Sequence, residues 1–169
     1  RFHVLANSDS EADQALKLAV RDRVLQEYGD LLETCTSKEE TLAALKNAQQ
    51  EISETAEAEV LAQGYTYPVR VSLVREEFPF KKYGDLIFPA GVYDALRIEI
   101  GEAKGKNWWC VLYPQMCYVD AAWGYSTEES HVRLQNTLTK EEFLVVSAME
   151  QKKVTPKIKC RLVELWSER

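Results

Sequence analysis

The chain opens with Phe2-His3-Val4-Leu5-Ala6, a short apolar run typical of a strand, and continues into Ser8-Asp9-Ser10-Glu11. The second run has the spacing of a capping box, in which the Ser8 hydroxyl accepts from a backbone amide and the Glu11 carboxylate reaches back. Apolar residues then recur at steps of three and four, at Leu16, Ala19, Val20 and Val24. These patterns predict a strand followed by an amphipathic helix that ends near Tyr28-Gly29.

The capping signature returns at Ser37-Lys38-Glu39-Glu40 and predicts a second, long helix that ends at Gly64, a natural C-cap residue. From Tyr65 the apolar period changes to two, as expected for a strand with one solvent-facing side. Pro89 and Gly91 suit a type I turn that begins a hairpin. Strands are predicted in five segments, near residues 2–6, 68–75, 92–100, 108–113 and 157–166.

Residues 120–138 show no clean period and are expected to form a long surface excursion. A third capping box, Thr139-Lys140-Glu141-Glu142, predicts a helix that ends before Thr155-Pro156. The order of elements predicts an α+β fold with a mostly antiparallel sheet of about five strands. Two N-terminal helices and one C-terminal helix are expected to pack on that sheet. A length of 169 residues suits a single domain over residues 1–169.

Composition excludes several classes of function. The net charge of −6 argues against binding to nucleic acid. No apolar run approaches the ~18 residues of a bilayer span, so we expect no transmembrane segment in this chain. The first residue is Arg1 rather than Met, and we expect that an N-terminal membrane-targeting segment was removed, by processing or by truncation. There is no C-x-x-C motif and there are only two histidines, so neither a metal nor a cofactor is expected.

The strongest enzymatic interpretation is a thiol hydrolase, with Cys110 as nucleophile and His3 or His131 as base. An apolar strand supplies no cation or helix N-terminus to stabilise a thiolate, which argues against it. Asn7, Asp9 and the nearby Asp13 are expected to be turn and capping residues rather than an acid–base or metal site. We therefore expect no catalytic residues and no enzymatic activity.

Cys110 and Cys117 lie seven positions apart around Pro114, a spacing at which a bend can bring their Cα atoms within reach of a disulfide. Two buried free thiols are the alternative. Trp108 and Trp109 are neighbours on a predicted strand, so they face opposite sides of the sheet and only one can enter the same core. The other is either covered by the rest of the chain or exposed as a partner anchor or a sugar-stacking platform.

A candidate partner-binding surface combines these tryptophans with the preceding loop at residues 101–107, which two glycines should make mobile. The loop is basic in a protein that is acidic overall, and a basic protrusion beside an aromatic anchor suits binding of a partner. The candidate residues are Lys104, Lys106, Asn107, Trp108 and Trp109. The competing surface lies on the acidic first helix, around Asp13, Lys17 and Arg21.

Several short motifs of the sequence stand out together: Phe2-His3-Val4-Leu5-Ala6-Asn7-Ser8-Asp9-Ser10, Asp13-Gln14, Leu16-Lys17, Val20-Arg21-Asp22, Tyr83-Gly84-Asp85-Leu86, Pro89-Ala90-Gly91 and Gly105-Lys106-Asn107-Trp108-Trp109-Cys110-Val111-Leu112. In this order they resemble the stage II sporulation protein R family of endospore-forming bacteria. The resemblance runs from Arg1 to about Asp120; beyond it only the general layout is similar. The resemblance implies no catalytic residues in this chain.

The resemblance implies a protein made in the forespore, exported by an N-terminal membrane-targeting segment, and acting between the two membranes around the forespore. There it would be an intercellular signal that triggers a membrane-embedded aspartic protease of the mother cell. That protease then processes the precursor of sporulation sigma factor E. The alternative, from another class of function, is a cell-wall hydrolase or glycan-binding module that uses Trp108 or Trp109 as a stacking platform.

Overall fold

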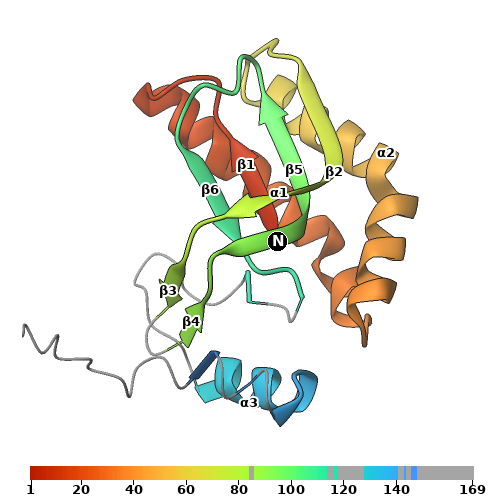
Figure 1. The fold of residues 1–169 in the computed structure, drawn as a ribbon. Coiled ribbons are helices and arrows are strands. Elements are labelled where there is room, and N and C mark those ends of the chain that lie inside the picture. The colour runs from red at the N-terminus through yellow and green to blue at the C-terminus, as the bar shows by residue number, and fades with distance from the viewer. Residues whose placement is uncertain (84–85, 114–115, 118–127, 141–142, 144–145, 148–169) are drawn as a thin grey trace, which may run out of the picture.

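Four strands form the central sheet of the computed structural model, which describes residues 1–83, 86–113, 116–117, 128–140, 143 and 146–147. Their order is β2-β5-β1-β6 (Figure 1). The strands are β1 (Phe2–Leu5), β2 (Val69–Phe78), β5 (Gly91–Ile100) and β6 (Asn107–Cys110). They confirm four of the five predicted strands, and the fifth, near 157–166, lies outside the described residues.

The described sheet is mixed: two of its three strand pairs are antiparallel, in line with the prediction of a mostly antiparallel sheet, and the third pair is parallel. β1 runs antiparallel to β6 but parallel to β5, while β2 and β5 are antiparallel. The chain leaves β1 through two helices before it returns to the sheet at β2. β5 follows only after β2, so β1 and its parallel neighbour are separated by a long connection, as parallel strands require, and not by a tight hairpin. The α+β class itself is confirmed.

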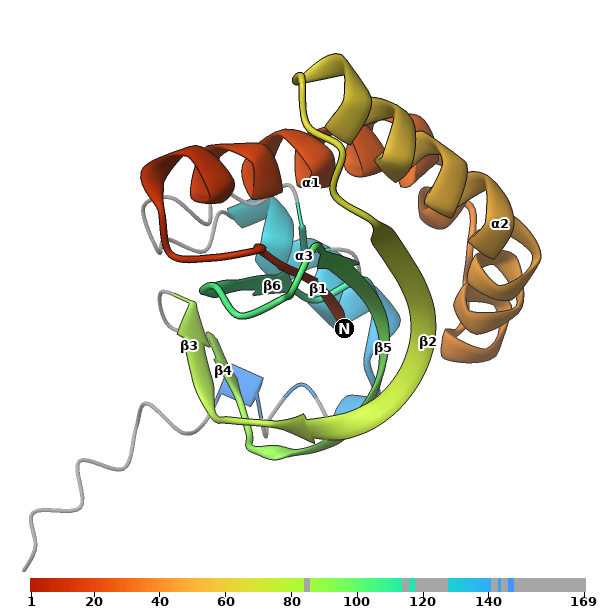
Figure 2. The ribbon, with the colours of Figure 1, turned by 90° about the horizontal axis from the view of Figure 1, so that it is seen from above.

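Helices α1 (Glu11–Glu33) and α2 (Lys38–Ala62) cover one face of the sheet (Figure 2). The N-cap of α1 is Ser10 rather than the predicted Ser8, because the Ser8 hydroxyl is hydrogen-bonded to the Asp13 carboxylate. The helix also continues past Gly29, which is buried within it. Ser37 caps α2 as predicted, and after α2 Gly64 takes a positive φ of 84°.

The apolar core lies between the sheet and these two helices. Its fully buried side chains come from every layer: Phe2 and Val4 in β1, Leu96, Ile98 and Ile100 in β5, Val20 in α1, and Ile52 and Val60 in α2. Residues on β1 and β5 that pair across the ladder, such as Val4 and Ile98, point to the same side. The apolar residues that alternate along these strands therefore form the side of the sheet that faces the helices.

Strands β2 and β5 extend beyond the sheet into a hairpin arm made of β3 (Lys81–Tyr83) and β4 (Leu86–Phe88). The short ladder keeps the register of the long one and is separated from it only at Pro79-Phe80 and Pro89-Ala90. Proline has no backbone N–H to donate, so each proline interrupts the ladder. The predicted turn at Pro89 is therefore wrong: the prolines mark a break in the arm.

Helix α3 (Glu128–Thr137) lies within residues 120–138, which were predicted to be an irregular excursion. The described residues of the helix predicted from Thr139, at positions 140, 143, 146 and 147, are also helical. They help to form a second apolar cluster, made of Phe88, Val111, Met116, Leu134 and Val146. The C-terminal helical part of the chain therefore begins earlier than predicted and packs on the base of the arm. Among the described residues, no helix is both long and apolar enough to cross a bilayer.

A disulfide joins Cys110 and Cys117, whose Cα atoms lie 5.2 Å apart. Both cysteines are buried and belong to the first cluster, whereas Val111 and Met116 between them belong to the second. The segment that the disulfide closes therefore holds the two clusters against each other.

Replacing both cysteines by serine should lower the free energy of unfolding by ~2 kcal/mol, because a short closed loop no longer restricts the unfolded chain. Guanidinium denaturation of the parent and the double variant, each with and without reductant, measures this. Reductant should destabilise the parent alone. Equal stability of the parent in both conditions would contradict the prediction.

Candidate functional site

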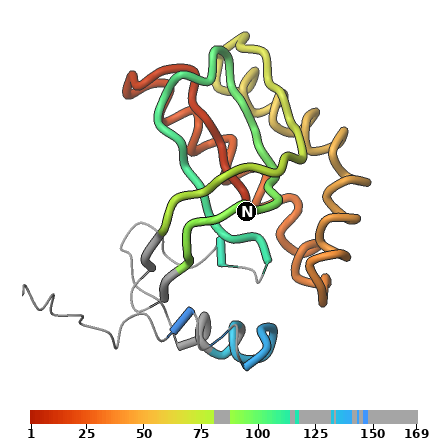
Figure 3. Tube along the Cα trace, in the orientation of Figure 1, coloured from red at the N-terminus to blue at the C-terminus, as the bar shows by residue number. Residues whose placement is uncertain are grey.

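The β1–α1 turn (residues 7–10) and the β5–β6 loop (residues 101–106) meet at one end of the molecule, which we call the apex (Figure 3). The loop amides of Gly105 and Lys104 donate to the carbonyls of Ala6 and Asn7, at 2.9 and 3.2 Å. The Lys106 amide donates to Asp9 Oδ1 at 2.6 Å. The sequence predicts a mobile loop here, whereas these bonds attach it to the turn.

The Asp13 carboxylate, only 4% exposed, is the centre of the apex. Its Oδ2 accepts from the Ser8 hydroxyl at 2.5 Å and from the Asn7 amide at 2.9 Å. Tyr67, in the connection between α2 and β2, also helps to lower the pKa of this carboxyl. These hydrogen bonds, from Ser8 and Asn7 above all, hold the pKa of Asp13 below its ordinary value. Asn7 Oδ1 in turn accepts from the Glu102 amide at 2.9 Å, so one carboxylate connects three segments of the chain.

Close backbone approach at the apex requires two glycines. A Cβ on Gly101, whose φ is +60°, would overlap the Asn7 side chain, and a Cβ on Gly105 would overlap the Ser8 carbonyl. Ala103 also has a positive φ, of 52°, which is strained for a residue with a Cβ. The loop therefore has one fixed and partly strained shape.

Lys17 fastens helix α1 to the same loop. Its side chain is buried, and its amine donates to Gln14 Oε1 at 2.6 Å and to the Lys106 carbonyl at 3.1 Å. Burial and the nearby Arg21 lower its pKa. The Gln14 amide donates to the Ser8 carbonyl at 2.9 Å. The sequence did not predict these supporting roles. The signal that could have indicated them is that Asn7, Gln14 and Lys17 all lie in motifs that resemble the family.

The five candidate partner-binding residues do not form one surface. Lys104 and Lys106 are exposed at the apex, and Lys104 pairs with the neighbouring Glu102 at 2.8 Å. Asn107 and Trp109 point to the side of the sheet that faces away from α1 and α2. Trp108 points toward the helices.

The two tryptophans are both partly buried, in different surroundings. The Trp108 ring packs edge-on against Phe2 at 5.7 Å, and the Arg21 guanidinium lies 4.8 Å from its centre. Trp109 packs against Phe78 at 5.8 Å and near the guanidinium of Arg1. The sequence correctly predicts that they face opposite ways, and β1–β6 pairing decides which one joins the core.

Cys110 and His3, two residues of the hydrolase hypothesis, point to opposite sides of the sheet, because Cys110 pairs with Phe2, the neighbour of His3. Cys110 is disulfide-bonded, and His131 lies in α3. His3 is buried, with Nε2 2.6 Å from Glu76 Oε1 and Nδ1 3.0 Å from the Asn107 amide nitrogen. Burial and the positive charge of Arg97 lower the pKa of His3 to about 4, so it is neutral near pH 7. The described part of the chain holds no group of His, Cys, Asp or Glu suited to a metal ion.

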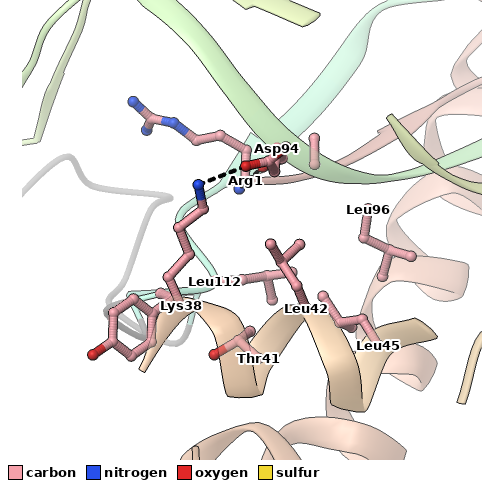
Figure 4. Close-up of a pocket in the computed structure, with 10 residues that line it drawn as sticks. Arg1, Lys38, Thr41, Leu42, Leu45, Asp94, Leu96 and Leu112 are labelled. Atoms are coloured by element: carbon pink, nitrogen blue, oxygen red, sulfur yellow. Dashed lines mark hydrogen bonds and ion pairs between the residues drawn. The ribbon is translucent and has the colours of Figure 1, made fainter. Parts of the chain in front are cut away.

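A small pocket lies where the first turns of α2 meet β5 (Figure 4). Its volume is about 80 Å³, and leucines, among them Leu42 and Leu112, line its apolar side. Lys38 and Asp94 form a 2.6 Å ion pair at its rim. A site for a small organic molecule needs roughly 300 Å³ or more, so we place the candidate site at the apex instead.

Asp13→Asn should destabilise the protein by about 1–3 kcal/mol at neutral pH, because an amide cannot replace the ionised acceptor. The folded pKa of Asp13 is lowered from 3.8, so its stabilisation is complete above that pH and is lost as pH falls through the folded value. The difference between parent and variant should therefore shrink below about pH 4. Urea unfolding from pH 7 to pH 2 measures it.

Asp30→Asn, at an exposed position of the same helix, is the control and should stay within about 0.5 kcal/mol of the parent at every pH. A pH-independent effect of Asp13→Asn would show that the carboxylate charge is not what stabilises the apex.

The chain matches known proteins over the part that contains the sheet, the apex and the disulfide. The family model described as stage II sporulation protein R matches residues 1–123. A relative named stage II sporulation protein R, from Bacillus subtilis (strain 168), is 33% identical over 178 residues, which cover 99% of this chain and 80% of the relative. No solved structure matches the chain. These matches confirm the resemblance: the chain belongs to the stage II sporulation protein R family.

Proposed function

We propose that this chain is an intercellular signal of sporulation that acts by binding. In this proposal it is exported from the forespore into the space between the two membranes. There it activates a membrane-embedded aspartic protease of the mother cell, which processes the precursor of sigma factor E. Membership of the family supports a sporulation signalling role. The main observation that supports the proposal is the apex. There, motifs that resemble the family come from distant parts of the sequence and are joined by hydrogen bonds.

The shape of the apex favours recognition of a partner. Hydrogen bonds to Asp13 and Asn7 fix the loop before any partner arrives, so binding costs little loop entropy. Lys104 and Lys106 project from this fixed loop and are exposed. Positive side chains on an acidic protein orient it toward a partner with acidic or carbonyl groups. We therefore propose that the apex meets the protease.

The surroundings of the candidate nucleophile and base also favour binding over catalysis. The Cys110 sulfur is bonded to Cys117, and His3 is buried between Glu76 and Asn107. Neither has a reactive partner within the described residues. We propose that the protein has no hydrolytic activity of its own.

The test is activation of the protease in reconstituted membranes by purified parent and variant protein. Lys104→Glu with Lys106→Glu should raise the concentration needed for half-maximal activation by about fivefold or more, the effect of losing ~1 kcal/mol at an interface. Both side chains are exposed, so thermal stability should stay within about 0.5 kcal/mol of the parent. Precursor cleavage on gels measures activation.

The matched control is Lys46→Glu combined with Lys140→Glu, which makes the same charge change on exposed lysines outside the apex. This control should activate like the parent. Equal losses in both double variants would mean that net charge, not the apex, is recognised. Turnover of a peptidoglycan or peptide substrate by the parent protein would favour the hydrolase alternative instead.

A further inference from the structure

Helix α2 ends in a backbone motif that holds an aromatic residue beside its last turn. The Gly64 amide donates to the Leu61 carbonyl at 2.9 Å, and the Tyr65 amide donates to the Val60 carbonyl at 3.1 Å. Gly64 has a positive φ of 84°. These features define a Schellman motif, in which the residue after the glycine folds back onto the end of the helix. Tyr65 is therefore held close to the turn that carries Leu61.

The connection between α2 and β2 (residues 63–68) is joined to the apex. The Gly101 amide, at the start of the β5–β6 loop, donates to the Pro68 carbonyl at 2.8 Å (Figure 1). The Tyr65 ring stacks on Tyr67, with 5.4 Å between the ring centres and 24° between the planes. Tyr67 in turn lies close enough to Asp13 to affect its pKa. The connection is thus the third segment of the apex, beside the β1–α1 turn and the β5–β6 loop.

Two apolar side chains of this third segment are accessible, and we call Leu61 and Tyr65 the anchor pair. Leu61 is 63% exposed, the largest fraction among the large apolar side chains that the structure describes. The Tyr65 side chain is partly exposed, and its hydroxyl makes no hydrogen bond within the described part of the chain. Exposed apolar surface with a polar rim is typical of an interaction site.

The charges around the anchor pair differ between its two sides. On the helix side Glu57 is exposed one turn before Leu61. On the loop side Lys104 is 74% exposed and pairs only with the neighbouring Glu102, and Lys106 is exposed and makes no ion pair within the described residues. A partner with a carboxylate is therefore favoured in one orientation, with its negative charge toward the loop.

We propose that Leu61 and Tyr65 are the apolar anchor of the apex and receive an apolar side chain of the partner. A carboxylate in the same partner segment binds the loop lysines. This inference rests on the proposed function, in which the partner is the protease, and adds the residues and the chemistry of the contact. The sequence expects such an anchor at Trp108 and Trp109, whereas here it comes from the α2–β2 connection. Because backbone hydrogen bonds already hold the anchor pair, binding costs little additional order.

The first test is Leu61→Ser in the activation assay. It should raise the concentration needed for half-maximal activation by about fivefold or more, while maximal activation stays unchanged, because an anchor contributes to binding only. Tyr65→Ala should act in the same direction. Thermal unfolding checks that each variant is folded, and if Tyr65→Ala is not, Leu61→Ser decides, since Leu61 is exposed.

The matched control is Leu31→Ser, which makes the same change at a 43% exposed leucine of α1. Leu31 lies roughly 30 Å along the helix from the end that meets the apex, at 1.5 Å per residue. This control should activate like the parent. Equal losses in Leu31→Ser and Leu61→Ser would overturn the inference, because the effect would then not be specific to the apex.

The second test places the photoreactive residue p-benzoylphenylalanine at position 61 or at position 31 of the full chain. After irradiation with membranes that contain the protease, we expect an adduct with the protease from position 61 and none from position 31. Adduct formation reports proximity, so small changes in stability do not affect it. Absence of an adduct from position 61 would overturn the inference.

The outcomes separate this inference from the proposed function. If the lysine variants weaken activation but Leu61→Ser does not, the anchor pair is wrong and the proposed function stands. If neither change weakens activation by an active parent, the apex is not the contact surface and both fail. If the parent protein does not activate the protease at all, the proposed function fails, and this inference fails with it.

Discussion

Burial of the Asp13 carboxylate determines the arrangement of the apex. An ionised group out of water is costly unless hydrogen bonds replace its solvation. Ser8 and Asn7 supply those bonds, so the turn between β1 and α1 must be in place for them to form. The Asn7 side chain, held by Asp13, also accepts a hydrogen bond from the Glu102 amide and so fixes the β5–β6 loop. The shape of the β5–β6 loop therefore depends on the hydrogen bonds around the buried Asp13 carboxylate.

The two sides of the central sheet carry different kinds of side chain. Its helix-facing side carries the apolar core, with Val4 and Ile98 fully buried, while the opposite side carries a balanced network around Arg97. The adjacent residues Trp108 and Trp109 fall on these two sides. The Trp108 indole therefore packs on the core beside Arg21, while the Trp109 indole packs against Phe78 on the opposite side of the sheet.

The segment from Cys110 to Cys117 has a comparable role at the opposite end of the sheet. Cys110 and Leu112 face the first apolar cluster, and Val111 faces the second. The disulfide fixes this alternation where the chain leaves the sheet. The family match covers this segment as well as the apex, so both belong to the part of the chain that resembles the relative from Bacillus subtilis.

The sequence by itself determined the elements with strong local patterns. Alternation at Val69, Val71 and Leu73 located β2, and the cap at Ser37 located the start of α2, because these signals depend on neighbouring residues only. Tertiary structure decided the direction of β1 beside β5, since pairing between distant strands leaves no local trace. It also decided that the N-cap is Ser10 and not the predicted Ser8, because the Ser8 hydroxyl is hydrogen-bonded to the Asp13 carboxylate. The candidate residues are divided between the apex and the side of the sheet opposite the helices because of the strand register, which only the folded chain defines.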